Sequence, residues 1–248
     1  MRKRAIGFCL LLLGSAHAAE GQLPEKFTNL KILPESISRA ALIDTMRAFS
    51  RALGARCDYC HVEKADGHEL DFAKDDKRTK RTARVMFRMV QDLNTKYLTE
   101  VVERPTPNVI VRCETCHRGQ PRPKPLEDVL QEALNAGGLD SAIQKYRDLR
   151  KDYYGSFSYD FRELPLNTLG ARLTAQRRYD EALAMFRLNL EYFPSSPQVH
   201  AGLAETYIAR ADTANGRQEL VKASQLAPDD PRIRRRLSDL DGVRASSR

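Results

Sequence analysis

The pattern Cys-x-x-Cys-His occurs twice in this 248-residue chain, as CDYCH at Cys57–His61 and as CETCH at Cys113–His117. Two thiols three positions apart on one turn can each add to a vinyl group on one edge of a porphyrin. The histidine that follows is carried beneath the ring, where a neutral imidazole nitrogen can bind the iron. Each copy therefore predicts one covalently bound haem c. The expected attachment residues are Cys57, Cys60, Cys113 and Cys116, and the expected iron ligands are His61 and His117.

Other uses of paired cysteines fit this pattern less well. The two pairs of a zinc ribbon are separated by roughly 15–20 residues, whereas here the gap runs from Cys60 to Cys113. Zinc also gives no reason for a histidine directly after each pair. A thioredoxin-like dithiol needs a βαβ context, and no strand pattern surrounds either copy. Structural disulfides remain an alternative in an exported chain.

The first 18 residues have the three parts of a secretory signal peptide. A positive start at 2–4 precedes the apolar run Ile6–Leu13, and Ala16-His17-Ala18 is a small-x-small cleavage site. The apolar run is far shorter than the roughly 20 residues of a membrane span, although an uncleaved anchor is the alternative. We expect residues 1–18 to be removed, and the mature protein to be periplasmic without a membrane-spanning segment.

Removal of the signal peptide changes the cysteine and charge counts. Cys9 leaves with it, so four cysteines remain and two haems use all of them. Three of the 41 basic residues leave and none of the 33 acidic residues does, which lowers the formal charge from +8 to about +5 (38 − 33). Haem propionates bring this close to neutral. The basic composition is therefore weak evidence for a nucleic-acid partner, and no recognition motif supports one.

Each motif follows a segment with the apolar spacing of a helix. The first, Ser36–Leu53, places Leu42, Met46, Phe49 and Leu53 on one face, and Gly54 is suited to end it in a left-handed turn. The second, from about Arg81 to Val101, carries a stripe made of Met86, Val90, Leu93 and Tyr97, with Met89 beside it. Between the two, Glu63–Lys80 is expected to be a solvated connection that contains an exposed His68.

Periodicity leaves the role of the methionines open. Met46 could bind the first iron opposite His61, or it could fill the core, as a methionine on an apolar stripe often does. Met86 or Met89 could serve the second iron in the same way. Spacing alone does not choose between them.

The two units of helix and motif resemble the cytochrome c subunit of photosynthetic reaction centres. The similarity lies in MRAFSRALG at Met46–Gly54 leading into CDYCH, and in ARVMFRM at Ala83–Met89 followed, after Leu93-Asn94, by CETCHRG at Cys113–Gly119. It covers roughly residues 30–125. In that family each haem follows a helix whose methionine binds the iron from the far side. The resemblance therefore implies Met46 as ligand of the first iron, and Met86 rather than Met89 as ligand of the second.

The chain also departs from that family. The family subunit carries four haems in two similar halves, and one of these haems has a second histidine in place of methionine; this chain has one pair of motifs and no match for that histidine. It also lacks a lipid-anchor cysteine. A single half-unit is similar to soluble dihaem relatives from bacteria that do not all photosynthesise. The resemblance thus implies electron transfer with redox partner proteins, either soluble or membrane-bound, and leaves the pathway open.

A second pattern begins beyond the proline-rich segment 121–125. Pro194 and Pro228 are 34 residues apart, as are Leu169 and Leu203, and 34 residues is the tetratricopeptide period. We therefore expect an all-α protein with a small dihaem c-type cytochrome domain and a short tetratricopeptide-like domain. Its expected parts are a signal peptide at 1–18, an extended segment at 19–29, the haem domain at 30–125, linking helices that could form a degenerate repeat at 126–165, and repeats with a capping helix at 166–248.

These features predict an electron carrier rather than an enzyme, with the repeats serving either for partner docking or as a scaffold on the haem domain. Methionine opposite histidine raises the potential relative to two histidines. A peroxidase would instead need an iron with an open position and nearby acid–base groups, for which the sequence offers His68 alone. A third hypothesis is an assembly factor in which the repeats bind a partner and the haems are structural.

Overall fold

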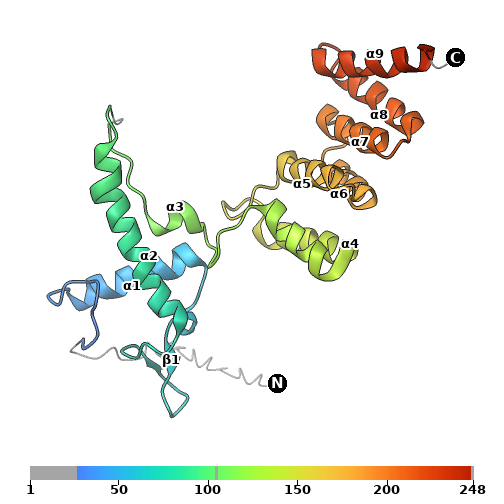
Figure 1. Ribbon diagram of the computed structural model, residues 1–248. Helices are drawn as coiled ribbons and strands as arrows, with labels where there is room; N and C mark the ends of the chain where they lie inside the picture. Colours follow the sequence, from blue (N-terminus) through green and yellow to red (C-terminus); the bar gives the residue numbers. More distant parts are fainter. Residues whose placement is uncertain (1–26, 104–105, 247–248) are drawn as a thin grey trace, which may run out of the picture. The chain divides into compact units, whose positions relative to one another are not determined.

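The computed structural model describes residues 27–103 and 106–246, with side chains up to Gly242 (Figure 1). Its regular structure is helical apart from one short hairpin, in which β1 (Val62–Glu63) pairs antiparallel with β2 (Leu70–Asp71). This confirms the all-α prediction, although the hairpin directly after the first motif was not predicted. The predicted signal peptide lies outside the described residues. No described helix combines the length and apolar content needed to cross a membrane.

The chain divides into two compact units. One contains the residues up to Ser50 together with Arg56–Val111, and the other contains Arg51–Ala55 together with Arg112 and the residues after it. The first Cys-x-x-Cys-His motif belongs to the former unit and the second motif to the latter. The domain boundary near Pro125 stays a prediction.

Helix α1 (Arg39–Leu53) begins three residues later than predicted. Its start is set by Ser38, whose side chain accepts a hydrogen bond from the Ala41 N–H at 3.2 Å, while its carbonyl accepts one from the Leu42 N–H at 3.0 Å. A serine in this position satisfies N–H groups that the first turn leaves unpaired. The helix ends as predicted at Gly54, with φ +58°.

Helix α2 (Arg78–Asp92) begins three residues earlier than predicted and does not continue as an α-helix to Val101. It passes into a π-helical turn, η2 (Leu93–Tyr97), and a 3₁₀ turn, η3 (Leu98–Glu100). Within η2, the Asn94 side chain donates to the Val111 carbonyl and accepts from the Val111 N–H, both at 2.8 Å. This pair of hydrogen bonds ties the segment that leads to the second motif to the end of α2.

The C-terminal helices follow the predicted repeat. They are α4 (Leu126–Tyr153), which is interrupted at Gly138, then α5 (Glu163–Ala175), α6 (Tyr179–Tyr192), α7 (Pro197–Ala209), α8 (Thr213–Leu226) and α9 (Pro231–Ser246). Helices α5, α7 and α9 begin at 163, 197 and 231, and α6 and α8 at 179 and 213, so equivalent helices recur every 34 residues. The interruption of α4 coincides with the turn predicted at Gly137-Gly138.

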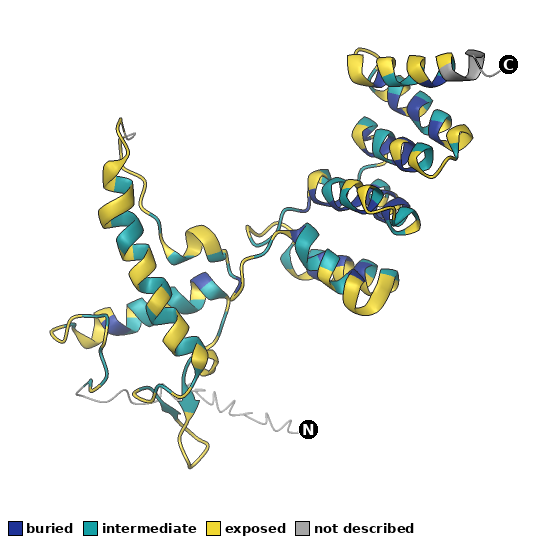
Figure 2. Cartoon of the chain, viewed as in Figure 1, coloured by how far each residue is buried: buried dark blue, intermediate teal, exposed yellow. Residues whose placement is uncertain are grey.

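Packing in the repeats depends on glycines that let two helices lie close to one large side chain. A Cβ added at Gly170 would lie 2.7 Å from the Phe186 ring, and one added at Gly202 would lie 2.3 Å from it. Both distances are too short for a real Cβ, so Phe186 of α6 packs against helices α5 and α7 where these glycines occur. Figure 2 shows the buried residues concentrated in these helices.

Candidate haem sites

The first motif forms a single tight turn, which begins shortly after the end of α1. Cys57–Tyr59 is a 3₁₀ turn (η1), and the His61 N–H donates to the Cys57 carbonyl at 3.0 Å. Two hydrogen bonds attach this turn to the start of α2. Thr79 Oγ1 donates to the Tyr59 carbonyl at 2.5 Å, and Lys77 Nζ donates to the Asp58 carbonyl. The two thiols and the histidine therefore come from one turn, as attachment to a porphyrin edge requires.

His61 is half-buried and neutral at physiological pH. Burial lowers the pKa of its imidazole to about 4, with further lowering by the positive charges of Lys80, Lys77 and Arg84 and a weaker opposing effect of the Phe72 backbone. The Phe72 ring packs edge-on against the imidazole, with centroids 5.0 Å apart. Nδ1 is buried and has no hydrogen bond of ordinary geometry. A neutral imidazole is the form that binds a metal.

A charged cluster supports the loop that carries Phe72. Lys80 Nζ donates to the Phe72 carbonyl at 2.8 Å and to the Lys74 carbonyl at 2.6 Å. Asp75 forms ion pairs with Arg84 at 2.6 Å and with Lys31 at 2.7 Å. Hydrogen bonds from these two cations hold the pKa of the Asp75 carboxyl well below its usual range.

The second motif forms the short helix α3 (Cys113–His117). Its first turn is capped by Thr115, whose Oγ1 accepts a hydrogen bond from the Arg112 N–H at 3.0 Å. At its end, His117 Nδ1 lies 2.8 Å from the Gln120 carbonyl oxygen. A carbonyl can only accept, so Nδ1 carries a proton, and in the neutral imidazole the lone pair is then on Nε2. This tautomer leaves Nε2 as the nitrogen that can bind iron.

The chain turns sharply after His117 and meets the end of α1. Arg118 and Gly119 both have positive φ, +50° and +82°. The Gly119 N–H donates to the Ala52 carbonyl at 2.9 Å. A Cβ added at Gly54 would lie 2.1 Å from the Gly119 carbonyl oxygen, so this close approach of two backbones requires glycine at position 54.

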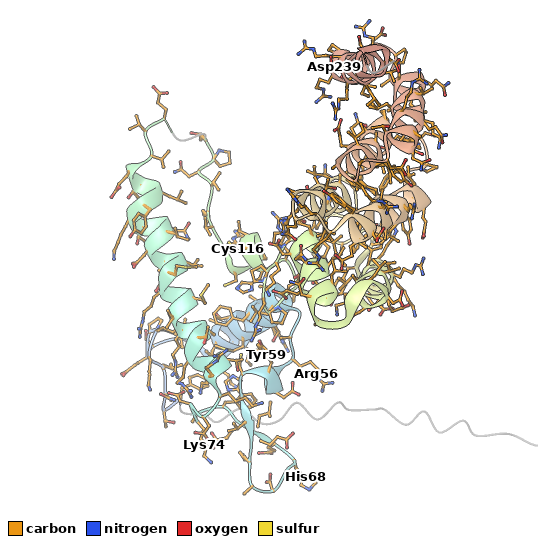
Figure 3. The ribbon with its side chains drawn as sticks, turned by 45° about the vertical axis from the view of Figure 1, so that its right-hand side comes forward. Arg56, Tyr59, His68, Lys74, Cys116 and Asp239 are labelled. Atoms are coloured by element: carbon orange, nitrogen blue, oxygen red, sulfur yellow. The ribbon has the colours of Figure 1, made fainter. Side chains whose placement is uncertain are left out.

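The four cysteines of the two motifs are free thiols. Cys57 and Cys116 are exposed, while Cys60 and Cys113 are half-buried, and burial raises the pKa of the latter two thiols. Figure 3 shows Cys116 on α3. Within the described residues, no group of three or more His, Cys, Asp and Glu side chains could hold a metal ion.

Burial distinguishes the three candidate methionines. Met46 and Met86 are half-buried, whereas Met89 is 42% exposed. Helices α1 and α2 contact each other through Phe49 and Phe87, whose ring centroids are 5.8 Å apart in an edge-on arrangement. Iron ligation by Met46 and Met86 stays a prediction.

His68 is exposed, as predicted, at the tip of the loop between β1 and β2 (Figure 3). Its backbone N–H donates to the Asp66 carboxylate at 3.1 Å.

The residues present fit two c-type haems. Both motifs offer free thiols beside a half-buried histidine, and the buried Nδ1 of His61 has no hydrogen bond of ordinary geometry. The helices α1 and α2 carry apolar faces with little buried surface: between residues 27 and 125, Leu42 and Ala52 are the buried apolar side chains among those described. Covalently held porphyrins would add apolar surface to such a small domain.

Sequence reasoning did not identify Asn94, Gln120 or Thr79. Asn94 stands in the stretch that resembles the reaction-centre subunit, which is the one signal that could have found it. Gln120 and Thr79 act through partners 38 and 20 residues away, and a single sequence contains no pattern that pairs them.

Two family profiles match the chain. The profile of the family described as photosynthetic reaction centre cytochrome C subunit matches residues 14–176, and a tetratricopeptide repeat profile matches residues 173–240. The photosynthetic reaction center cytochrome c subunit of Thermochromatium tepidum is 32% identical over 114 residues, which is 45% of this chain and 25% of the relative. That of Rubrivivax gelatinosus is 34% identical over 100 residues, or 40% and 24%. The chain thus spans about a quarter of the length of these relatives.

Proposed function

Because this chain belongs to the photosynthetic reaction centre cytochrome C subunit family, we propose that it is a periplasmic dihaem c-type cytochrome that carries electrons between redox partner proteins. The observation that carries this proposal is the pair of turns that each present two free thiols and a half-buried histidine. Haem c, when bound, supplies an iron that cycles between ferrous and ferric states.

The protein residues hold and tune these groups. Cys57 and Cys60 attach one haem, and Cys113 and Cys116 attach the other. His61 and His117 would each give an imidazole nitrogen to an iron. Met46 and Met86 would each give a thioether, which would raise both potentials relative to a second histidine. Irons whose ligand positions were taken up by these residues would favour electron transfer over peroxidase chemistry, which needs an open position.

Attachment is tested on the exported full-length protein. Mass spectrometry should find two covalent haems and no reactive thiol, and N-terminal sequencing should begin at Ala19. Reactive cysteines or bound zinc in place of haem would overturn the proposal.

Ligation is tested with Met46→Leu and Met86→Leu, and Met89→Leu is the matched control on the same helix. Because leucine keeps the size and apolarity of methionine, the free energy of unfolding should change by less than about 1.5 kcal/mol. Each ligand variant should show a high-spin haem and a lowered potential in a redox titration followed at the haem bands. If Met89→Leu opens an iron and Met86→Leu does not, the second ligand is Met89.

The repeats are proposed to dock a protein partner, which the match to a tetratricopeptide profile supports, since stacked helical repeats create extended binding surfaces. A fragment that begins at Leu126 should compete with the full-length protein for the redox partner in membrane or soluble fractions. If the fragment does not compete, docking occurs on the haem domain instead.

A further inference from the structure

The three residues after the second motif are held by a set of hydrogen bonds that reaches far along the chain. Ser158 Oγ donates to the Arg118 carbonyl at 2.7 Å, and Gln120 Nε2 donates to the Ser158 carbonyl. Ser158 lies in the loop between α4 and α5, which Figure 1 shows beside the segment that leads from α3 to α4. Two bonds in opposite directions thus join this loop to the residues that follow His117.

Gln120 is the connecting residue. Its side chain is only 5% exposed, and it is the sole buried residue between Leu53 and Pro125 among those described. Its side chain reaches the α4–α5 loop, and its backbone carbonyl accepts a hydrogen bond from His117 Nδ1, with 2.8 Å between nitrogen and oxygen. Because a buried polar side chain is costly to leave unpaired, the Ser158 carbonyl fixes where Gln120 lies and hence where its own carbonyl points.

The first motif is arranged differently. The Phe72 backbone acts on the His61 imidazole, but His61 Nδ1 makes no hydrogen bond of ordinary geometry, and the Phe72 ring packs edge-on against the imidazole. The two histidines therefore differ in the hydrogen bonding of Nδ1, which is the feature that tunes ligand basicity at a metal.

We propose that Gln120 and Ser158 are positioning residues for the second haem ligand, so that the α4–α5 loop, which lies outside the predicted haem domain, forms part of that haem site. This rests on the proposed function, since it requires a haem iron on His117. The hydrogen bond from Nδ1–H to a firmly placed carbonyl makes the imidazole a stronger donor and favours the ferric state. Loosening the carbonyl weakens that bond and raises the potential of the second haem.

The experiment uses the full-length holoprotein and measures both midpoint potentials. Ser158→Ala removes the hydroxyl, and Gln120→Leu keeps the volume but removes the amide. Each should raise one midpoint and leave the other at its wild-type value, and the midpoint that moves should be the one that Met86→Leu moves. Ser158→Thr retains a hydroxyl and should restore the wild-type value.

Two controls separate positioning from general destabilisation. Ser196→Ala removes the cap of α7, where Ser196 Oγ accepts a hydrogen bond from the Val199 N–H. It should lower stability about as much as Ser158→Ala does, without moving either midpoint potential. Gln144→Leu removes an exposed glutamine of α4 that bonds Asp148 and should also leave both midpoints unchanged.

The outcomes distinguish this inference from the proposed function. If both haems are attached and low-spin but Ser158→Ala and Gln120→Leu leave both midpoints unchanged, the inference is overturned and the proposed function stands. If the wild-type protein carries no haem on Cys113 and Cys116, the proposed function itself fails. If Gln120→Leu does not fold, the comparison of Ser158→Ala with Ser158→Thr decides the inference alone.

Discussion

Helices α2 and α6 are nearly equal in length, at 15 and 14 residues, yet they are stabilised by different surroundings. No residue of α2 is buried. In α6, by contrast, six residues are buried: Ala182, Leu183, Met185, Phe186, Leu188 and Asn189. Figure 2 shows the same contrast between helices α1 and α2 and the repeat helices α5–α8.

The difference indicates where each part of the protein obtains its core. In the repeats, side chains of neighbouring helices bury one another, and equivalent contacts recur with the 34-residue period. In the segment 27–125, the apolar faces of α1 and α2 find few side-chain partners, so the haems would complete the core. Porphyrins and polypeptide are then interdependent for the folding of α1 and α2, whereas the repeat helices α5–α8 have a core made of side chains alone.

The largest expected effect comes from preventing attachment of the first haem. In a protein with Cys57→Ala and Cys60→Ala, we expect complete loss of that haem and loss of amide protection throughout α1 and α2, because little else is buried there. Protection in α5–α8 should not change. Hydrogen exchange followed by mass spectrometry measures both. Asp58→Ala, in the same turn, keeps both thiols and should behave as wild type. Protected α2 amides without the haem would show that this segment has a sufficient core of its own.

The reverse test removes a core side chain from the repeats. Phe186→Ala should cost about 3–5 kcal/mol, because Phe186 is 3% exposed and packs against Gly170 and Gly202. Urea unfolding followed by circular dichroism measures the loss, while the haem spectrum should not change. Phe157, which is 90% exposed, is the control: Phe157→Ala should change stability by less than about 0.5 kcal/mol. An altered haem spectrum in Phe186→Ala would contradict the independence of the two parts.

A smaller effect is expected at the contact between two backbones near the second motif. Gly54→Ala forces a residue with a side chain into positive φ and places its Cβ against the Gly119 carbonyl, so it should cost at least about 2 kcal/mol. Gly67 also has positive φ, +70°, but no atom lies within 4 Å of an added Cβ, so Gly67→Ala isolates the strain, at about 1 kcal/mol. Thermal unfolding of the holoprotein compares the two. Equal losses of stability in the two variants would mean that the contact between Gly54 and Gly119 adds nothing to the cost of the substitution.

The smallest effects concern charge. Asp75→Asn weakens a partly buried cluster and should cost about 1–3 kcal/mol at neutral pH. Glu205→Gln removes an exposed ion pair with Arg236, 2.7 Å long, and should cost less than about 1 kcal/mol. Because the pKa of Asp75 is lowered, its contribution is present above the usual carboxyl range and is lost only on strong acidification. The difference between wild type and Asp75→Asn, measured by urea unfolding, should therefore shrink as the pH falls below about 4, and a difference that grows would contradict this sign.

Much of the helical framework could be predicted because it depends on neighbours in sequence. The stop at Gly54, the turn at Gly137-Gly138 and the 34-residue recurrence all follow from local conformation or from periodic apolar residues. The boundaries of α2 were wrong at both ends, and the hairpin after His61 was missed. Their causes are not local: Thr79 and Lys77 bond the first motif, and Asn94 bonds Val111.

The sequence by itself determined the fold class and predicted the chemistry of the two motifs, because a Cys-x-x-Cys-His turn and an apolar helix face are set by residues within a few positions of one another. Only the tertiary structure decided that His117 carries its proton on Nδ1, that Gln120 is buried, and that Gly54 meets Gly119. The burial of Gln120 and the contact of Gly54 with Gly119 depend on groups that lie 38 or more residues apart in the sequence. The proton on His117 Nδ1 depends on the turn that leads to Gln120, and these long-range contacts fix the direction of that turn. Hydrogen bonds of that kind require a defined distance and angle, and no spacing within a single sequence specifies either.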